Sequence, residues 1–316
     1  MFNKDSLIYV AGHTGLLGSA LVRVLQREGY TNIITKKHEE LELTDKNAVE
    51  DFFKSTAIEY VFLCAGKVGG IIGNKREPAS YLHENLLIQD NIFEAVNNYG
   101  IKNMIFYGSS CTYPKVCKQP MAEEDWMSGV IEETSMGYAA AKIAGIIGCK
   151  SYNTQYNTSK FICVIPNSIY GENDNFDLEN SHVFSALIRK IDTAKREDKE
   201  SLTLWGSGDP RREFIYSEDV ADASVFLMKN SDKLENSHYN LGTGVDYSIK
   251  ELAKAISEVI GYTGEIKWDT EKPDGTMKKL LDSSKFLALG WKPKISFEDG
   301  LKLTYEWYNN RLKDIR

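Results

Sequence analysis

A short glycine-rich segment restricts the possible folds of this chain more than any other feature. Residues 12–18 have the spacing G-x-x-G-x-x-G and join an apolar run to a segment with helical periodicity. Gly12 permits a sharp exit from a strand, Gly15 lets a pyrophosphate approach the backbone, and Gly18 lets the helix pack on the sheet. The exposed N–H groups and the helix dipole then favour phosphates. The alternative is a tight turn without a ligand, but the flanking strand and helix favour a dinucleotide site.

Strand and helix patterns alternate through the first half of the chain. The strand segments are continuous apolar runs, which are typical of parallel strands covered on both faces. We therefore predict an α/β protein with a Rossmann-type, doubly wound parallel sheet. The expected strands are 7–11, 32–34, 60–64, 104–107 and 161–165, and the expected helices are 16–28, 45–54 (with Thr44 as its N-cap), 81–99 and 137–156.

The alternation ends after about Gly171. Shorter elements, at 183–190, 202–205 and 249–260, lie among polar and charged stretches. We expect a smaller C-terminal cap that binds substrate over the carboxyl ends of the sheet, where open α/β sheets hold ligands. The predicted division is a dinucleotide-binding Rossmann domain at 1–170 and a mainly substrate-binding domain at 171–316, with segments at about 212–242 and 280–298 returning to the first domain.

Composition argues against several classes of protein. The 38 basic and 45 acidic residues give a net charge of −7, whereas nucleic-acid-binding domains usually carry a basic face. No run approaches the roughly 20 apolar residues of a membrane-spanning helix, and the N-terminus lacks the pattern of a signal peptide. The five cysteines show no C-x-x-C spacing. We therefore expect no metal site, no nucleic-acid or membrane partner, and a cytoplasmic location.

The end of the second predicted strand bears on the choice of nicotinamide cofactor. An NAD site commonly has Asp or Glu there, to bind the ribose 2′-hydroxyl. This chain instead has Lys36 and Lys37, which suit the 2′-phosphate of NADP. The alternative is a solvated lysine pair at the start of a loop.

A tyrosine and a lysine four residues apart suggest carbonyl reduction. Tyr138 and Lys142 lie on one face of a predicted helix, and Ser109 follows directly after a predicted parallel strand. Beside a nicotinamide, Tyr138 can protonate the carbonyl oxygen that Ser109 orients. We expect the ammonium of Lys142 to draw the pKa of the phenol down from about 10 and to bind the nicotinamide ribose.

Together these residues resemble the extended short-chain dehydrogenase/reductase superfamily, and further motifs are similar to those of the GDP-L-fucose synthase family. Members act on GDP-4-keto-6-deoxymannose, epimerising C3 and C5 and then reducing C4 with NADPH. The resemblance extends over nearly the whole chain, although Thr14 and Lys190 stand where the familiar bacterial pattern has arginines. The motifs that carry it are 11–13, 67–71, 108–115, 180–183, 204–208, 212–214 and 272–276.

The resemblance implies a role for each site residue. Cys111 and His182 match the epimerisation acid and base, and a thiol and an imidazole both exchange protons near neutral pH. Arg212 is expected to grip the diphosphate. The other expected substrate contacts are Ser110, Asn167, Val183, Lys190, Trp205 and Lys279. The expected cofactor contacts are Gly12, His13, Thr14, Gly15, Leu16, Leu17, Lys36, Ala65, Lys67, Tyr138, Lys142, Pro166, Asn167, Ile169 and His182.

Other functions stay open at this point. A related enzyme could reduce C4 of a GDP-4-keto-6-deoxyheptose for surface polysaccharide and leave epimerisation to another protein. A 4-epimerase or dehydratase shares the fold, and a protein that binds NADP without turnover would not need the tyrosine–lysine pair. The helices at 81–99 and 137–156 resemble those that form a four-helix dimer interface in this superfamily, so we expect a homodimer.

Overall fold

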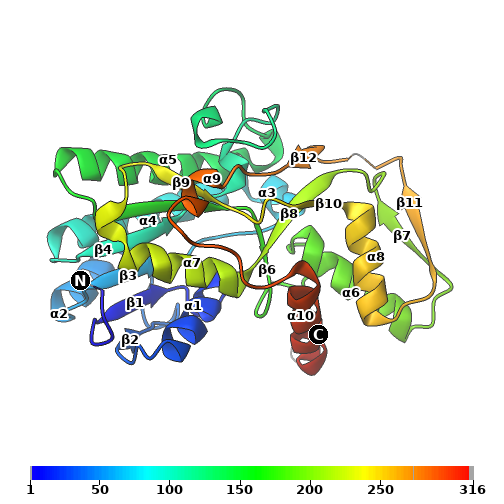
Figure 1. Ribbon diagram of the computed structural model, residues 1–316, viewed down its shortest axis with the longest axis horizontal. Helices are drawn as coiled ribbons and strands as arrows, with labels where there is room; N and C mark the ends of the chain where they lie inside the picture. The colour runs from blue at the N-terminus through cyan, green and yellow to red at the C-terminus, as the bar shows by residue number, and fades with distance from the viewer. Residues whose placement is uncertain (1, 273, 313–316) are drawn as a thin grey trace.

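Six parallel strands form the centre of the larger half of the molecule in the computed structural model, which describes residues 2–272 and 274–312 (Figure 1). Their order across the sheet is β2-β1-β3-β4-β5-β9. Register is regular: Ile8 of β1 pairs with Ile33 on one side and with Tyr60 on the other. The strands are β1 (Ile8–Ala11), β2 (Ile33–Ile34), β3 (Tyr60–Leu63), β4 (Asn103–Tyr107), β5 (Phe161–Pro166) and β9 (His238–Leu241).

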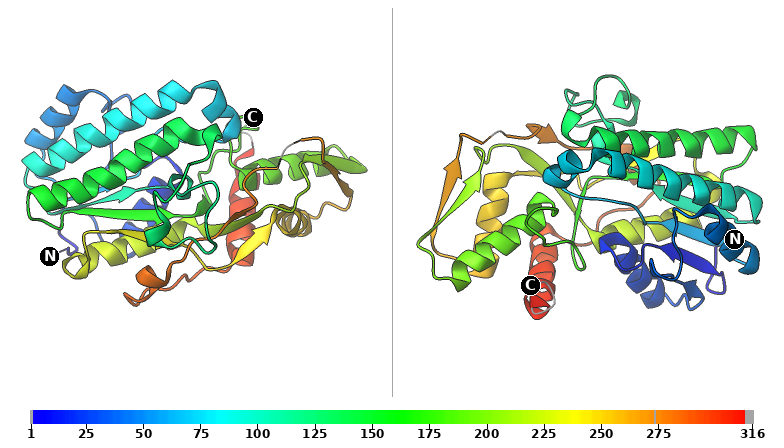
Figure 2. Two further views of the ribbon diagram at one scale, coloured as in Figure 1. Left: turned by 90° about the horizontal axis from the view of Figure 1, so that it is seen from above. Right: turned by 180° about the vertical axis from the view of Figure 1, so that it is seen from behind.

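Helices cover both faces of this sheet, as the apolar strands require (Figures 1 and 2). Side chains alternate between the faces: Val10 packs into a core with α1 (Leu16–Arg27) and α7 (Ser217–Lys229), whereas its neighbour Tyr9 packs into the opposite core. The second core is completed by α2 (Lys46–Ser55), α4 (Pro78–Asn98) and α5 (Met136–Gln155).

The strand order reverses between β1 and β3. The chain begins at β1, moves outward to β2, and returns to add β3, β4, β5 and β9 on the other side. Such a switch point opens a crevice at the carboxyl ends of the strands, where ligands bind. The predicted Rossmann-type sheet is confirmed.

The smaller half of the molecule has its own apolar core and two small sheets (Figure 2). In the first sheet, β8 pairs with β6, β10 and β12, and in the second β7 pairs with β11. The elements are β6 (Ser168–Tyr170), α6 (Val183–Arg196), β7 (Ser201–Trp205), β8 (Arg211–Tyr216), β10 (Asp246–Ser248), α8 (Ile249–Ile260), β11 (Glu265–Asp269), β12 (Lys278–Lys279) and α10 (Phe297–Asn310).

Two later segments lie against the large sheet. The first brings α7 onto one face and adds β9 at the edge, and the second contains α9 (Ser284–Leu287), which packs near β9. The domain boundaries stay predictions. Residues 273 and 313–316 lie outside the described residues. They belong to the predicted second domain, and residue 273 also belongs to the predicted motif at 272–276.

Two helices begin at residues other than those predicted, for local chemical reasons. Asp45 rather than Thr44 is the N-cap of α2, because its carboxylate accepts from the backbone N–H groups of Asn47 and Ala48. α4 begins at Pro78, three residues before the predicted start, because proline is well suited to the first helical turn. Among the described residues no helix is long and apolar enough to cross a bilayer.

Candidate active site

The glycine-rich turn connects β1 to α1 at the switch point. Gly12 has a φ of 80°, and a Cβ added there would lie 2.7 Å from the backbone nitrogen of Ala65, so the exits from β1 and β3 touch backbone to backbone. Gly15 is the N-cap of α1 and offers no side-chain cap, which leaves the first N–H groups of the helix available. The turn can therefore bind an anion at the carboxyl end of β1.

Gly18 has a different packing role from the predicted one. A Cβ at Gly18 would lie 2.1 Å from the carbonyl oxygen of Gly12, so the glycine lets α1 pack on its own turn rather than on the sheet. Within this turn Thr14 is exposed, and the Nδ1 atom of His13 is buried without a hydrogen-bond partner among the described residues. Leu16 and Leu17 form the first turn of α1.

Two predicted cofactor lysines lie after β2 and β3, and nearby acids contact both. Lys36 Nζ is 3.7 Å from Glu40 at the carboxyl end of β2. Lys67 Nζ lies 2.8 Å from Glu84 and 3.3 Å from Glu77, and its hydrogen bond with Glu84 is the main reason that the pKa of Lys67 is raised.

A clamp on the loop after β3 was not apparent in the sequence. The side chain of Asn85, on α4, accepts from the backbone nitrogen of Lys67 at 3.1 Å and donates to the backbone oxygen of Lys67 at 3.0 Å. It thereby fixes the segment that contains Ala65.

Ser109, Tyr138 and Lys142 gather at the carboxyl end of β4. Lys142 is buried; its Nζ atom donates to the backbone oxygen of Tyr107, the last residue of β4, at 2.8 Å. The same atom lies 5.8 Å from the centre of the Tyr138 ring, and Tyr138 hydrogen-bonds with Ser109. The predicted group of hydroxyl, phenol and ammonium therefore occupies one place.

Burial dominates the protonation of this group. It raises the pKa of Tyr138, the Cys111 thiol raises it further, and the hydrogen bond with Ser109 acts the other way. The sequence led us to expect that Lys142 would lower this pKa, but desolvation of the buried phenol raises it. Burial also lowers the pKa of Lys142 to about 8. Tyr138 is therefore an O–H group at neutral pH, as a proton donor must be.

Cys111 stands beside the same group, in the turn Ser110–Thr112 that follows β4. Its backbone N–H donates to Ser109 Oγ at 3.4 Å. Burial raises the pKa of the thiol, and the positive charge of Lys279 counteracts part of that rise. The half-buried Ser110 is the first residue of the turn.

His182 lies on the cap side as the exposed N-cap of α6, directly before Val183. Its loop rests on the large domain, where the backbone N–H of Gly70 donates to the Asn180 carbonyl at 2.9 Å. Among the described residues, no hydrogen bond joins His182 to Cys111.

Asn167 organises the exit from β5. The residue is buried, and its amide donates to Glu213 at 2.5 Å while its oxygen accepts from the backbone N–H of Ser168 at 3.1 Å. Pro166 ends β5 beneath it, and Ile169 lies in β6. Glu213, whose pKa burial raises, also accepts from the backbone N–H groups of Gly244 and Leu281.

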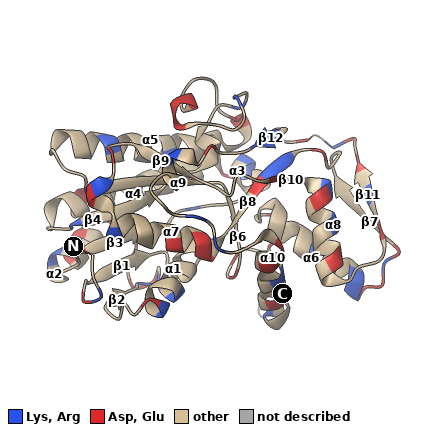
Figure 3. Cartoon of the chain, in the orientation of Figure 1, with Lys and Arg blue, Asp and Glu red and all other residues tan. Residues whose placement is uncertain are grey.

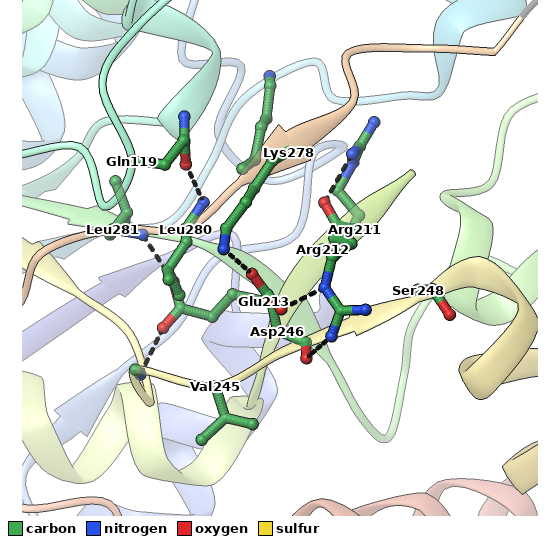
Figure 4. Close-up of polar contacts among 12 residues, drawn as sticks. Gln119, Arg211, Arg212, Glu213, Val245, Asp246, Ser248, Lys278, Leu280 and Leu281 are labelled. Atoms are coloured by element: carbon green, nitrogen blue, oxygen red, sulfur yellow. Dashed lines mark hydrogen bonds and ion pairs between the residues drawn. The ribbon is translucent and has the colours of Figure 1, made fainter. Parts of the chain in front are cut away.

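Basic residues lie next to one another on β8 and β12 (Figure 3). The partners of these cations differ between the two faces of the strand pair (Figure 4). The parallel register sets Lys278 beside Arg211 and Lys279 beside Arg212, so the members of each pair share a face. Arg211 and Lys278 both bind Asp246, at 2.6 and 2.9 Å.

The other face is not neutralised. Among the described residues no carboxylate lies within ion-pair distance of Arg212 or Lys279, and burial lowers the pKa of each. Within the described part of the chain, the guanidinium of Arg212 donates only to the backbone oxygen of Arg211, at 2.8 Å. Two partly buried cations without acids form a site for an anion.

Lys190 and Trp205 form a second, more open part of this surface. Lys190 Nζ lies 5.5 Å from the centre of the Trp205 ring, and burial lowers the pKa of Lys190. Trp205 is 62% exposed, so it is a surface ring and not the core residue that is the usual alternative for a tryptophan.

Similarity to known proteins covers nearly the whole chain. Residues 8–242 match the family model described as the NAD dependent epimerase/dehydratase family. GDP-L-fucose synthase 1 of Arabidopsis thaliana is 47% identical over 308 residues, which are 98% of this chain and 94% of that protein.

Two solved structures from Campylobacter jejuni are also similar. A GDP-6-OMe-4-keto-L-xylo-heptose reductase has a TM-score of 0.93 and 40% identity, covering 98% of this chain and 99% of that one. A GDP-D-glycero-L-gluco-heptose synthase, solved in the presence of NADPH, has a TM-score of 0.91 and 39% identity, covering 98% and 100%.

Proposed function

The chain belongs to the GDP-L-fucose synthase branch of the NAD dependent epimerase/dehydratase family, and we propose that it reduces the C4 ketone of a GDP-4-keto-6-deoxy sugar with NADPH. One observation carries the proposal: Ser109, Cys111, Tyr138 and Lys142 gather at the carboxyl end of β4, near a cation pair that has no carboxylate within ion-pair distance among the described residues. The relatives' names support both a fucose synthase and a heptose C4 reductase.

The residues present fit NADP. The uncapped start of α1 and the unpartnered Nδ1 atom of His13 suit a phosphate ligand, and Gly12 keeps the approach free of side chains. The nicotinamide supplies hydride when bound. We assign the pyrophosphate to the turn Gly12–Leu17 and the 2′-phosphate to Lys36. The remaining proposed cofactor contacts are Ala65, Lys67, Tyr138, Lys142, Pro166, Asn167, Ile169 and His182.

Proton transfer at C4 follows from the buried phenol. Tyr138 holds its proton at neutral pH and donates it to the ketone oxygen as that oxygen gains charge. Ser109 orients the oxygen through its hydroxyl, and the ammonium of Lys142, fixed by the Tyr107 carbonyl, stabilises the phenolate that remains. Each group acts from a position that β4 or α5 sets.

Epimerisation needs an acid and a base on carbons beside the ketone, where the protons are acidified by enolate formation. We assign these roles to Cys111 and His182. The charge of Lys279 near Cys111 favours the thiolate, which is the form that can remove a proton.

The GDP portion fits the cations of the cap. We assign the diphosphate to Arg212 and Lys279, because a guanidinium grips phosphate oxygens in pairs and, in the part of the chain that the structure describes, neither cation has an acid partner. Trp205 and Lys190 would line the nucleotide or sugar. Ser110, Asn167 and Val183 complete the proposed substrate contacts.

Incubation in deuterated water distinguishes the two candidate reactions. With GDP-4-keto-6-deoxymannose and NADPH, a fucose synthase incorporates deuterium at C3 and C5 and yields the GDP-L-fucose configuration. Reduction of C4 without deuterium at either carbon, and faster turnover of a GDP-4-keto-6-deoxyheptose, would instead identify the heptose reductase. A chain that oxidises no NADPH with either sugar would disprove the proposed function.

We also propose a cytoplasmic homodimer. All five cysteines are free, which suits a reducing compartment. Helices α4 and α5 lie side by side at the surface, and Met136 and Ile147 of α5 are 45% and 43% exposed (Figure 2). Light scattering at micromolar concentration should give twice the chain mass, and Ile147→Arg should lower it; a monomeric mass for the unmodified protein would refute the dimer.

A further inference from the structure

Three consecutive residues after β6 join the two halves of the molecule. Glu172 lies 3.4 Å from Arg23, and the side chain of Asn173 donates to Ser19 Oγ at 3.1 Å. Ser19 and Arg23 both belong to α1, the helix whose first turn forms the proposed phosphate site. Glu172 and Asn173 therefore hold the dinucleotide-binding helix.

The next residue contacts the cap instead. The hydroxyl of Ser185, in the first turn of α6, donates to the carboxylate of Asp174, which also accepts from the backbone N–H of Asn175 at 2.8 Å. Ser185 is fully buried. The N-cap of α6 is His182, whose side chain makes no cap hydrogen bond, so Asp174 supplies negative charge at this positive helix end.

The backbone conformation explains the change of direction. Asn173 has a φ of 62°, in the left-handed region that asparagine tolerates better than most residues. The chain therefore turns between Asn173 and Asp174, and neighbouring side chains reach helices in different halves of the molecule. We name residues 172–174 the α1–α6 bridge.

We infer that Asp174 is a positioning residue that fixes the first turn of α6, and with it His182, relative to the cofactor-binding helix. The inference rests on the proposed function, because it gives His182 its task. Burial raises the pKa of Asp174, while Ser185 and the nearby His182 act in the opposite direction, which places the carboxylate close to both.

A purely structural contact would behave differently from a positioning one. It would lower stability and slow both half-reactions alike. Loss of a positioning contact should slow epimerisation, which needs His182, far more than hydride transfer, which needs Tyr138. Oxidation of a GDP-6-deoxy sugar at C4 by NADP⁺ requires no epimerisation and therefore isolates the second reaction.

The test compares Asp174→Asn and Ser185→Ala with Asp299→Asn. Asp299 offers a matched control, because its carboxylate also accepts from a serine, Ser296, at the start of a cap helix, α10. The measurements are deuterium incorporation into the keto sugar, single-turnover oxidation at C4, and hydrogen–deuterium exchange of the backbone at 183–190 with and without NADP⁺.

Asp174→Asn and Ser185→Ala should each slow deuterium incorporation about tenfold, since small misplacements of catalytic groups have effects of that order or larger. Both variants should leave C4 oxidation within about twofold of the unmodified rate. Without NADP⁺, backbone exchange at 183–190 should be severalfold faster in both variants and unchanged in Asp299→Asn. With NADP⁺, the unmodified protein should gain protection there that both variants lack.

Unchanged backbone exchange at 183–190 in both variants would overturn the inference, as would equal slowing of the two half-reactions. Failure of the proposed function gives a different result. If the unmodified protein turns over no GDP sugar, backbone exchange at 183–190 still shows whether Asp174 and Ser185 fix the first turn of α6.

Discussion

At the scale of single residues, carboxylate partners distinguish the neutralised cations from those that we assign to the substrate. Arg211 and Lys278 share Asp246 on one face of the β8–β12 pair. Lys279 faces the other way without a carboxylate partner among the described residues, and its charge acts on Cys111. Neighbours in the sequence thus have opposite tasks, because successive strand residues face opposite sides.

Replacing Lys279 with methionine should raise the pKa of Cys111 further, because the charge that lowers it is lost while burial remains. Each unit of pKa removes about nine-tenths of the thiolate at a pH below the pKa. Alkylation of Cys111 by iodoacetamide at pH 8, measured by mass spectrometry, should therefore be severalfold slower in Lys279→Met than in the unmodified protein. Lys278→Met is the matched control and should leave the rate unchanged; equal rates in all three proteins would contradict the assignment.

The sequence predicted those site residues whose positions follow from regular secondary structure. Ser109, Tyr138 and Lys142 come together because parallel strands and helical spacing determine their places. The partners of Lys67 and the clamp by Asn85 could not be predicted, since α4 supplies these side chains from an unremarkable amphipathic pattern. The role of Asp174 could not be predicted either, because its contact with Ser185 depends on a backbone turn.

At the scale of elements, the packing of α1 against its own glycine turn shapes the proposed cofactor site. Gly18 allows the first helical turn to lie directly on Gly12, and Gly15 leaves the helix start uncapped. Continuous apolar strands were predictable because both faces of the large sheet are buried. The cap strands β6, β10 and β12 were not, since they are two or three residues long and their pairing comes from distant segments.

Gly18→Ala should therefore both destabilise the protein and weaken NADP⁺ binding. A Cβ 2.1 Å from the Gly12 oxygen forces the backbone apart, and overpacking of this kind costs about 1–3 kcal/mol. Gly15→Ala is the comparison, because its Cβ would meet the same oxygen at an ordinary 3.6 Å. Urea unfolding should show a loss for Gly18→Ala alone; unchanged stability would mean that α1 does not pack on its turn.

At the scale of the whole molecule, β9 is the edge strand that completes the large sheet, and side chains of the segment 113–126 contact it. His238 of β9 is buried, with Nε2 3.4 Å from the Tyr113 hydroxyl and its ring 5.3 Å from that of Trp126. Burial, together with the smaller effect of the charges of Lys150 and Lys285, lowers the pKa of His238 to about 3. The folded protein thus keeps this imidazole neutral.

Stability should consequently fall as the solution becomes acidic. Between about pH 6.5 and pH 3 the unfolded chain binds a proton at His238 that the folded chain does not, so stability decreases as pH falls through this window. At pH 5 the loss from this group is about 2 kcal/mol. Urea midpoints at pH 7 and pH 5 should differ less for His238→Gln than for the unmodified protein; an equal difference would contradict a buried neutral histidine.

The central claim, that Tyr138 gives its proton to a sugar ketone beside NADPH, is tested most directly by Tyr138→Phe. Consumption of NADPH with a GDP-4-keto-6-deoxy sugar should fall by a factor of about 10²–10⁴, the usual contribution of a general acid. Binding of NADP⁺ by calorimetry should be unchanged within about twofold, because the ring still fills its place. Turnover by the phenylalanine variant at the rate of the unmodified enzyme would contradict the account.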